Sequence, residues 1–336
     1  MNDYDDVAAE TRERVLKLAR DLEYTPTAAA RTLVTQRSRV IGVVLFTGEG
    51  HPDLQHPFFQ EVLVGLKHRV GGSGYDLLLF ANDVSENGTG ANSYLNRSRH
   101  HHVDAVALMG VDARDPEVQR LTSSNIPCVG VDLDVIGRRT GYVISDNDEG
   151  ARLAVRHLHE LGHTRIAVIT GMTTTRPGVD RLIGYRAELE ALGLPYLDDY
   201  VREGDFYFPS GYAGMQALLD LDEPPTAVFA ASDVMAVGAI RAAQERGLRV
   251  PQDLAVVGFD DIQLAQLAHP ALTTIRQDKV GLGAAAGDAL LRMLERPDAP
   301  PPVTTLPVEL VVRESTVAGA NRGEARAQGG ESRKRR

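Results

Sequence analysis

From Val40 onward, apolar runs of strand length alternate with segments that have the hydrophobic period of a helix. The apolar runs occupy residues 40–46, 75–81, 104–110, 126–132, 164–170, 226–232 and 254–260, with a last strand predicted at 308–315. The helices predicted between them occupy residues 58–70, 147–161, 179–192, 210–220, 233–246 and 279–295. Runs that are apolar throughout indicate parallel strands with helices on both faces of the sheet. Seven such strands with their connections span about 270 residues, which exceeds one ordinary sheet and predicts two similar α/β halves.

Two shorter helical patterns precede Val40. Residues 11–22 predict an amphipathic helix that needs a partner, with an apolar face made of Val15, Leu18, Ala19 and Leu22. Pro26 is well placed to open a second helix at residues 27–34, followed by a polar linker at 35–39. Because so short a helix is marginal alone in water, we expect it to be ordered only when it is docked on something.

The balance of charge is acidic, with 36 Lys and Arg against 46 Asp and Glu and a formal net charge of -10. This excludes a protein that coats nucleic acid with its whole surface. Two segments differ: residues 27–39 carry three arginines and no carboxylate, and residues 317–336 carry six basic groups against two acidic ones. We therefore expect only a small part of the chain to meet a polyanion.

Cysteine usage and hydropathy indicate a reducing, cytoplasmic location. The single Cys128 excludes an internal disulfide, and no cluster of Cys and His has zinc-ligand spacing, so no metal is expected. Neither a signal peptide at the amino terminus nor a run of 18 apolar residues is found, so no membrane contact is expected.

Motifs for catalysis are weak, and the sequence predicts no enzyme and no cofactor. Residues 281–286, GLGAAA, resemble a dinucleotide fingerprint, but close helix packing explains their small side chains better. Three histidines near one helix end lack carboxylate ligands, and residues 100–102 predict a polar turn before a strand. Cys128 is expected to pack inside an apolar strand.

Polar side chains follow two of the predicted strands, where open α/β sheets bind their ligands. Asp260 and Asp261 come at the end of one strand, and Ser232 and Asp233 at the end of another. Adjacent residues on a strand point apart, so one carboxylate that binds a ligand and one that caps a helix are more natural than a catalytic pair. The side chains that could hold the hydroxyl groups and the apolar face of a sugar are Arg181, Asp260, Gln277 and either Phe206 or Phe58.

An ordered series of segments resembles the LacI/GalR family of bacterial transcription regulators from residue 7 to about 315. The segments are TRERVLKLARDLEYTPTAAARTLVTQRSRVIGVV, HPFF, HLHELGHTRIAVITG, DRLIGYRAEL, VFAASDVMAVGAI and VPQDLAVVGFDDIQLAQLAHPALTTIRQD. The resemblance implies a two-lobed core like that of periplasmic binding proteins, built from two parallel-sheet lobes and preceded by a partial helical headpiece and a hinge helix. It also implies a homodimer or a dimer of dimers, and an effector bound between the lobes.

The family's effector contacts fall on matching positions of this chain. By resemblance, the effector-binding residues are Phe58, Arg181, Phe206, Ser232, Asp260 and Gln277. Many sugar-responsive members have asparagine where Ser232 stands, so the departure affects the identity of the ligand. The loop with His51, Asp53 and His56 is longer than the common version, and it either adds polar contacts or is a surface loop.

The hinge also matches the family. The residues that the resemblance assigns to contacts with the minor groove or the phosphates of operator DNA are Ala28, Ala30, Arg31, Leu33, Arg37 and Arg39. A pair of short helices can insert an apolar wedge, here Leu33 from each subunit, and kink the duplex. Because such a helix is marginal alone, DNA and the partner subunit can order it, and rotation of the lobes can melt it.

The resemblance divides the chain into four parts. Residues 1–25 are expected to be the remnant of a helix-turn-helix headpiece, 26–39 the hinge helix and linker, 40–316 the effector-binding and dimerisation core, and 317–336 a disordered basic tail. Family members usually begin with two further headpiece helices, one of which reads bases in the major groove, and by this resemblance the 336 residues are expected to lack both. Either the start position is misplaced or specific DNA binding has been lost.

The hypothesis from the sequence is a ligand-responsive repressor with a sugar or similar polar metabolite as effector. The alternative is a sugar-binding protein of the same fold that does not contact DNA. The sequence does not distinguish inducer from corepressor, or identify the metabolite.

Overall fold

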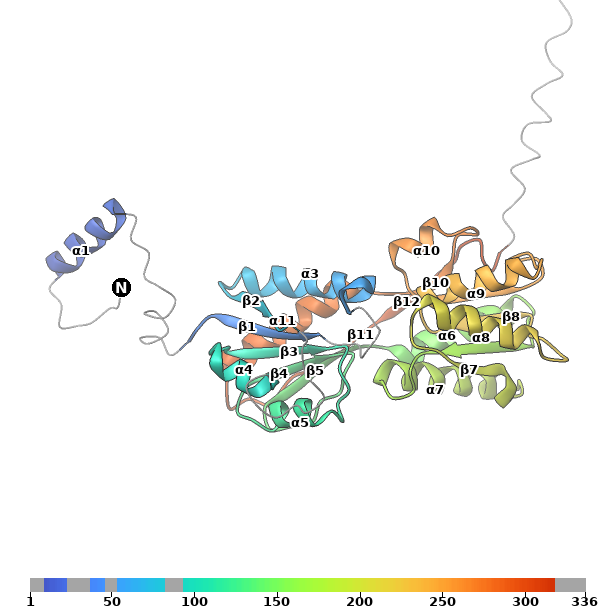
Figure 1. Ribbon diagram of the computed structural model, residues 1–336, viewed down its shortest axis with the longest axis horizontal. Helices are drawn as coiled ribbons and strands as arrows, with labels where there is room; N and C mark the ends of the chain where they lie inside the picture. The colour runs from blue at the N-terminus through green and yellow to red at the C-terminus, as the bar shows by residue number, and fades with distance from the viewer. Residues whose placement is uncertain (1–8, 23–36, 46–52, 82–92, 318–336) are drawn as a thin grey trace, which may run out of the picture.

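The computed structural model describes residues 9–22, 37–45, 53–81 and 93–317. Two α/β lobes lie side by side, which confirms the predicted fold class (Figure 1). The N-lobe contains a parallel six-stranded sheet in the order β11-β5-β4-β3-β1-β2. Its strands are β1 (Val40–Leu45), β2 (Asp76–Leu79), β3 (Ala105–Met109), β4 (Cys128–Val131), β5 (Thr140–Ser145) and β11 (Val303–Leu306).

Helices cover both faces of the N-lobe sheet, as runs of buried strand residues require. One face packs against α3 (Pro57–Gly71) and α11 (Lys279–Glu295), and the other against α4 (Tyr94–His100) and α5 (Pro116–Thr122). A short 3-10 helix, η1 (Asp53–Gln55), precedes α3. A side chain at Gly283 would collide with the carbonyl oxygen of Val62 on α3. The small residues at 281–286 therefore allow close packing of α3 and α11, as predicted.

The C-lobe contains a second six-stranded sheet, in the order β12-β10-β9-β8-β6-β7. Its strands are β6 (Ile166–Thr170), β7 (Val201–Glu203), β8 (Ala227–Ala230), β9 (Ala255–Asp260), β10 (Thr273–Gln277) and the antiparallel β12 (Val308–Val311). Its helices are α6 (Asn147–Glu160) and α7 (Arg176–Ala191) on one face, α8 (Phe208–Leu219) and α9 (Asp233–Glu245) on the other, and the short α10 (Gln263–Leu267) and η2 (Asp198–Tyr200).

The chain passes between the lobes at three places. It crosses from β5 to α6, from β10 to α11, and from β11 to β12. Each lobe is therefore assembled from segments that are distant in the sequence. The carboxyl ends of parallel strands from both sheets line the space where the lobes meet, and this arrangement places the candidate site.

Several predictions about the flanking segments fall outside the described residues. Hinge residues Ala28, Ala30, Arg31 and Leu33 lie there, as does the tail at 318–336. The predicted first helix is present as α1 (Ala9–Asp21), which lies apart from both lobes in Figure 1. That its apolar face packs against a partner remains a prediction.

One local expectation was wrong. His100 belongs to the last turn of α4, and only His101 and His102 form the turn that leads to β3. No helix within the described ranges is long and apolar enough to cross a membrane.

Candidate ligand-binding site

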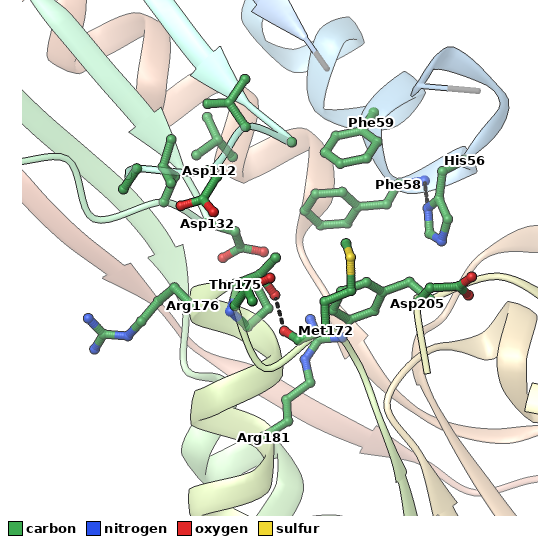
Figure 2. A pocket seen from close by; sticks show the side chains of 18 of the residues that line it. His56, Phe58, Phe59, Asp112, Asp132, Met172, Thr175, Arg176, Arg181 and Asp205 are labelled. Atoms are coloured by element: carbon green, nitrogen blue, oxygen red, sulfur yellow. Dashed lines mark hydrogen bonds between the residues drawn. The ribbon is translucent and has the colours of Figure 1, made fainter. Parts of the chain in front are cut away.

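A cavity of about 270 Å³ lies between the lobes, and we call it the interlobe pocket. Its N-lobe wall includes residues at the start of α3 and after β3 and β4, while its C-lobe wall includes residues after β6, β7 and β9. Figure 2 shows Phe58, Asp112 and Asp132 on one side of this space and Met172 and Arg181 on the other. The pocket thus occupies the position where open α/β sheets bind ligands.

Aromatic rings supply the apolar surface of the pocket. Phe58 and Phe59 stand in the first turn of α3 with their rings in an edge-to-face arrangement, 5.3 Å between centroids. Pro57 favours a helix start at this point, and His56 caps it by accepting a hydrogen bond from the Phe58 amide at Nδ1 (3.4 Å). Phe206 faces them from the C-lobe, with a left-handed backbone at φ 74°.

Arg181 is a buried cation in the wall of the pocket. Its Nε donates to Asn147 Oδ1 at 2.8 Å, and its Nη1 donates to the Ala231 carbonyl. The guanidinium lies 3.7 Å from the centroid of the Phe259 ring and 3.9 Å from Asp260 Oδ1. These contacts fix the orientation of the guanidinium, although burial lowers the pKa of Arg181.

Asp260 ends β9 with φ at 120°, a conformation that side chains rarely adopt. Gln277 Nε2 donates to its carboxylate at 2.6 Å, and Lys279 Nζ donates to its main-chain carbonyl at 2.6 Å. These bonds compensate for the strain and direct the carboxylate toward the pocket. Gln277 itself lies behind Asp260 and is not among the residues that line the pocket.

Asp132 is a pocket residue that sequence reasoning missed. It follows β4, has a left-handed backbone at φ 49°, and accepts a hydrogen bond from the Ser145 amide at 3.1 Å. Burial raises the pKa of the Asp132 carboxyl to about 6. The signal was present in the sequence, because Asp132 ends a predicted strand just as Asp260 does.

The longer loop that precedes α3 contributes one polar side chain to the pocket, that of His56. The His56 ring lies 5.4 Å from the ring of Tyr207 across the cleft. Burial lowers the pKa of His56, so the imidazole is neutral at pH 7. His51 lies outside the described residues, and Asp53 is in η1, away from the pocket lining.

Ser232, unlike Phe58, Arg181, Phe206 and Asp260, is not on the wall of the pocket. It is fully buried at the amino end of α9, where its hydroxyl accepts from the Met235 amide and donates to the Phe206 carbonyl at 2.9 Å. Ser232 therefore holds the backbone of Phe206 and caps a helix, roles that a strand-end position alone does not reveal.

The second carboxylate of the pair at 260–261 does not cap a helix, contrary to expectation. Asp261 instead forms ion pairs with Arg276 at 2.6 Å and with Arg313. Residue 262, which precedes α10, has no side-chain capping bond. The two adjacent carboxylates point to different partners, as their positions on a strand predict.

Other candidate groups have structural partners. His157 contacts Thr316 at 2.9 Å, and His163 contacts Thr226 at 3.0 Å. No group of three potential metal ligands occurs in the part of the chain that the structure describes. Cys128 is buried in β4, and burial raises the pKa of its thiol to about 12, which makes it inert.

The two described arginines of the linker lie on the N-lobe. Arg37 donates to the carbonyl of Leu294 at the end of α11, at 2.9 Å. The Asp104 carboxylate accepts from the amides of Ser38 and Arg39 at 3.0 and 2.9 Å. Asp104 thereby fixes the point at which the chain enters the N-lobe.

Comparisons with known proteins agree with this architecture. Residues 155–316 match the model of the periplasmic binding protein-like domain. The chain is 36% identical over 318 residues to the HTH-type transcriptional regulator CelR of Thermobifida fusca, covering 94% of this chain and 92% of that protein. The structure of a CelR–cellobiose complex matches with a TM-score of 0.74 and 33% identity, covering 93% and 92% of the two chains. The lac repressor dimer bound to operator and the anti-inducer ONPF matches with a TM-score of 0.78 and 29% identity, covering 94% and 93%.

Proposed function

Because the chain belongs to the LacI family of transcription regulators, we propose that it is a repressor whose binding to operator DNA is controlled by a sugar or similar polar metabolite in the interlobe pocket. The observation that carries this proposal is the composition of the pocket. Carboxylates, the buried guanidinium of Arg181 and several aromatic rings converge there from both lobes. A ligand held by both lobes favours one relative orientation of them, which is what a ligand-controlled switch needs.

The pocket side chains suit a sugar in complementary ways. A sugar ring presents hydroxyl groups around its rim and C–H groups on its faces. We assign Asp132 and Asp260 as acceptors for hydroxyl groups and Arg181 as a charged donor. Phe58 and Phe206 supply flat apolar surfaces for the C–H faces. The solved CelR structure holds cellobiose, which supports a carbohydrate as the first ligand class to test.

We assign the pocket carboxylates to binding rather than to catalysis, because the related proteins are transcription regulators. Ser232 and Gln277 act indirectly in this proposal, through Phe206 and Asp260. We place the protein in the cytoplasm, where operator DNA is available.

DNA contact is assigned to the hinge of a homodimer. In this proposal Leu33 from each subunit enters the minor groove, and Arg31 contacts phosphates or the groove edge. The resemblance also assigns Ala28 and Ala30 to this hinge. Arg37 and Arg39 connect this hinge to the N-lobe through their contacts with α11 and Asp104.

Thermal unfolding with candidate ligands tests the pocket. Cellobiose, glucose and ribose are added in turn, and a ligand at 100 times its Kd should stabilise the protein by about 2.7 kcal/mol. Asp260→Asn and Arg181→Lys should lose most of this stabilisation. Asp253→Asn, which changes a carboxylate paired with Arg249 on the C-lobe surface, should keep it. Variants of the pocket that respond as strongly as the parent would show that the ligand binds elsewhere.

Selection from a random pool of DNA duplexes tests the regulator assignment. The 336-residue chain is used alongside the same chain extended by its in-frame upstream codons. An enriched palindromic sequence, bound with an affinity that changes when the ligand is added, is the expected result. If neither protein enriches a sequence, the chain is not a DNA-binding regulator.

A further inference from the structure

The end of the N-lobe that points away from the C-lobe carries an excess of basic side chains. The loops that precede the parallel strands form this end, together with the last turns of α3, α4 and α11. Six exposed side chains define what we call the basic face: Arg39, Lys67, Arg99, Arg138, Arg292 and Arg296. In Figure 1 this end lies to the left, where the chain arrives at β1.

Hydrogen bonds join the segments of the basic face into one surface. Arg37 donates to Leu294 at the end of α11, and Arg139 donates to the neighbouring Met293 carbonyl at 3.0 Å. These contacts bring the linker, the loop before β5 and the end of α11 together. The guanidinium of Arg39 lies beside Gly74, in the turn that follows α3. The charges therefore come from distant parts of the sequence but share one face.

The cations of the basic face outnumber the carboxylates at the same end of the N-lobe, which are Asp76, Asp104, Glu295 and Asp298. Across the described ranges, none of its six side chains forms an ion pair. The C-lobe arginines provide a contrast, since Arg241, Arg246 and Arg249 each pair with a carboxylate at 2.5, 2.6 and 2.8 Å. Unpaired cations on one face create a positive potential there, whereas paired ones largely cancel.

The rest of the molecule has the opposite charge. Residues 147–272, most of the C-lobe, contain 10 arginines and lysines against 18 aspartates and glutamates. At the pocket end of the N-lobe, Asp112, Asp115, Asp132 and Asp134 follow the strands. The basic face therefore lies at one end of an otherwise acidic molecule. This distribution of charge excludes a general affinity of the whole surface for polyanions.

We propose that the basic face is a second DNA-contacting surface, which holds the phosphate backbone flanking the operator. Residues 37–39 leave the N-lobe at this face, so DNA bound by the hinge lies on the same side of the molecule. The inference rests on the proposed function, because the hinge brings the duplex to the face. The contacts involve phosphates and carry no sequence preference.

Two triple variants with the same change in net charge test this surface. The first is Lys67→Gln, Arg138→Gln, Arg296→Gln on the basic face. The matched control is Arg241→Gln, Arg246→Gln, Arg249→Gln on the C-lobe. Binding to a fluorescent duplex is followed by anisotropy over a series of KCl concentrations, for the selected operator with mixed-sequence flanks and for the same operator trimmed to its core.

The basic-face variant should show a plot of log affinity against log salt that is shallower by roughly one for each lost phosphate contact. The difference should appear with the flanked duplex and largely vanish with the trimmed one. The control should match the parent on both duplexes, and both variants should keep the parent's melting temperature and its response to the ligand.

If the basic-face variant and the control show the same slope of log affinity against log salt, the proposal is overturned. The basic face would then be assigned to contact with an acidic protein. This result differs from a failure of the proposed function, in which the parent itself selects no DNA sequence or ignores the ligand.

Discussion

At the residue scale, Asp132 illustrates how a binding group is maintained at a cost in stability. Its carboxylate is enclosed where β4 meets the pocket. The charge of Arg181 and hydrogen bonds from the Ser145 amide and the Asn147 side chain do not fully replace the water that it loses. The group therefore holds a proton more tightly in the folded chain than in the unfolded one. A residue selected only for stability would not be a carboxylate at this position.

Asp132→Asn should stabilise the protein without ligand at pH 7. The pKa of Asp132 rises from 3.8 to about 6 on folding, so stability is lost as the pH increases through this interval. The variant should gain at most about 3 kcal/mol at pH 7 and almost nothing at about pH 3, where the carboxyl is largely protonated in both states. Chemical denaturation across this range measures the difference. Asp298→Asn, an exposed position, is the control, and an equal gain at both pH values would contradict the assigned cause.

At the scale of elements, the crossover from β10 to α11 connects pocket geometry to both lobes. Lys279 begins α11, donates to the Asp260 carbonyl at 2.6 Å, and lies 3.6 Å from Glu61 Oε2 on α3. Its ammonium therefore holds the strained turn of the C-lobe against a helix of the N-lobe. We regard Lys279 as a positioning residue, because it does not line the pocket.

Lys279→Met should weaken ligand binding about tenfold, since the lost charged hydrogen bond contributes about 1.5 kcal/mol to the position of Asp260. Isothermal titration calorimetry with the ligand identified by thermal unfolding measures this change. Lys279→Arg should recover most of the affinity because it restores a charged donor. Lys67→Met, on the exposed surface of α3, should bind like the parent. Equal affinity of Lys279→Met and Lys67→Met would exclude the positioning role.

The contact of α3 with α11 depends on the absence of side chains. Gly283→Ala would drive a methyl group into the main chain at Val62, and the helices would have to separate. We expect a loss of about 1–3 kcal/mol in the free energy of unfolding. Gly71→Ala is the matched control, because nothing lies within 4 Å of an added methyl group there. Urea denaturation compares the two, and similar stabilities would show that the helices can adjust.

The elements that sequence patterns predicted were those with continuous apolar runs or long helical periods. β5 and β10 were missed because TGYVIS and TTIRQ mix polar and apolar residues. The edge strands β7 and β11 are only three and four residues long, and α4, α5 and α10 span seven residues or fewer. Such short elements are stabilised by tertiary contacts that leave little periodicity in the sequence.

The same limit applies to the site. Strand ends indicated Asp260 as a pocket residue, and the chemistry of a sugar site added Arg181 and either Phe206 or Phe58. The resemblance then named both phenylalanines. Asp132 also ends a predicted strand, so the reasoning that indicated Asp260 could have indicated it too. By contrast, Ser232 points toward the backbone of Phe206, and no pattern in the sequence fixes that direction.

At the scale of the whole molecule, the two ends of the N-lobe sheet have different surroundings. The N-lobe strands run from the end that carries the basic face toward the pocket, and β3 and β4 are followed directly by residues that line it, so one parallel sheet spans the distance between the two proposed binding surfaces. The three crossovers and the pocket walls join the C-lobe to this sheet. A ligand that changes how the lobes meet can therefore act on the N-lobe as a rigid body.

This arrangement predicts a coupling between ligand and operator that is equal in both directions. If the ligand changes operator affinity by some factor, the operator must change ligand affinity by the same factor, because both bind to one pair of lobe orientations. Calorimetry of the ligand with and without saturating operator, and anisotropy of the operator with and without saturating ligand, measure the two factors. We expect a factor of about 5–150, corresponding to about 1–3 kcal/mol. A factor of one would mean that the pocket binds its ligand without changing the surface that meets DNA, which would contradict a ligand-responsive regulator.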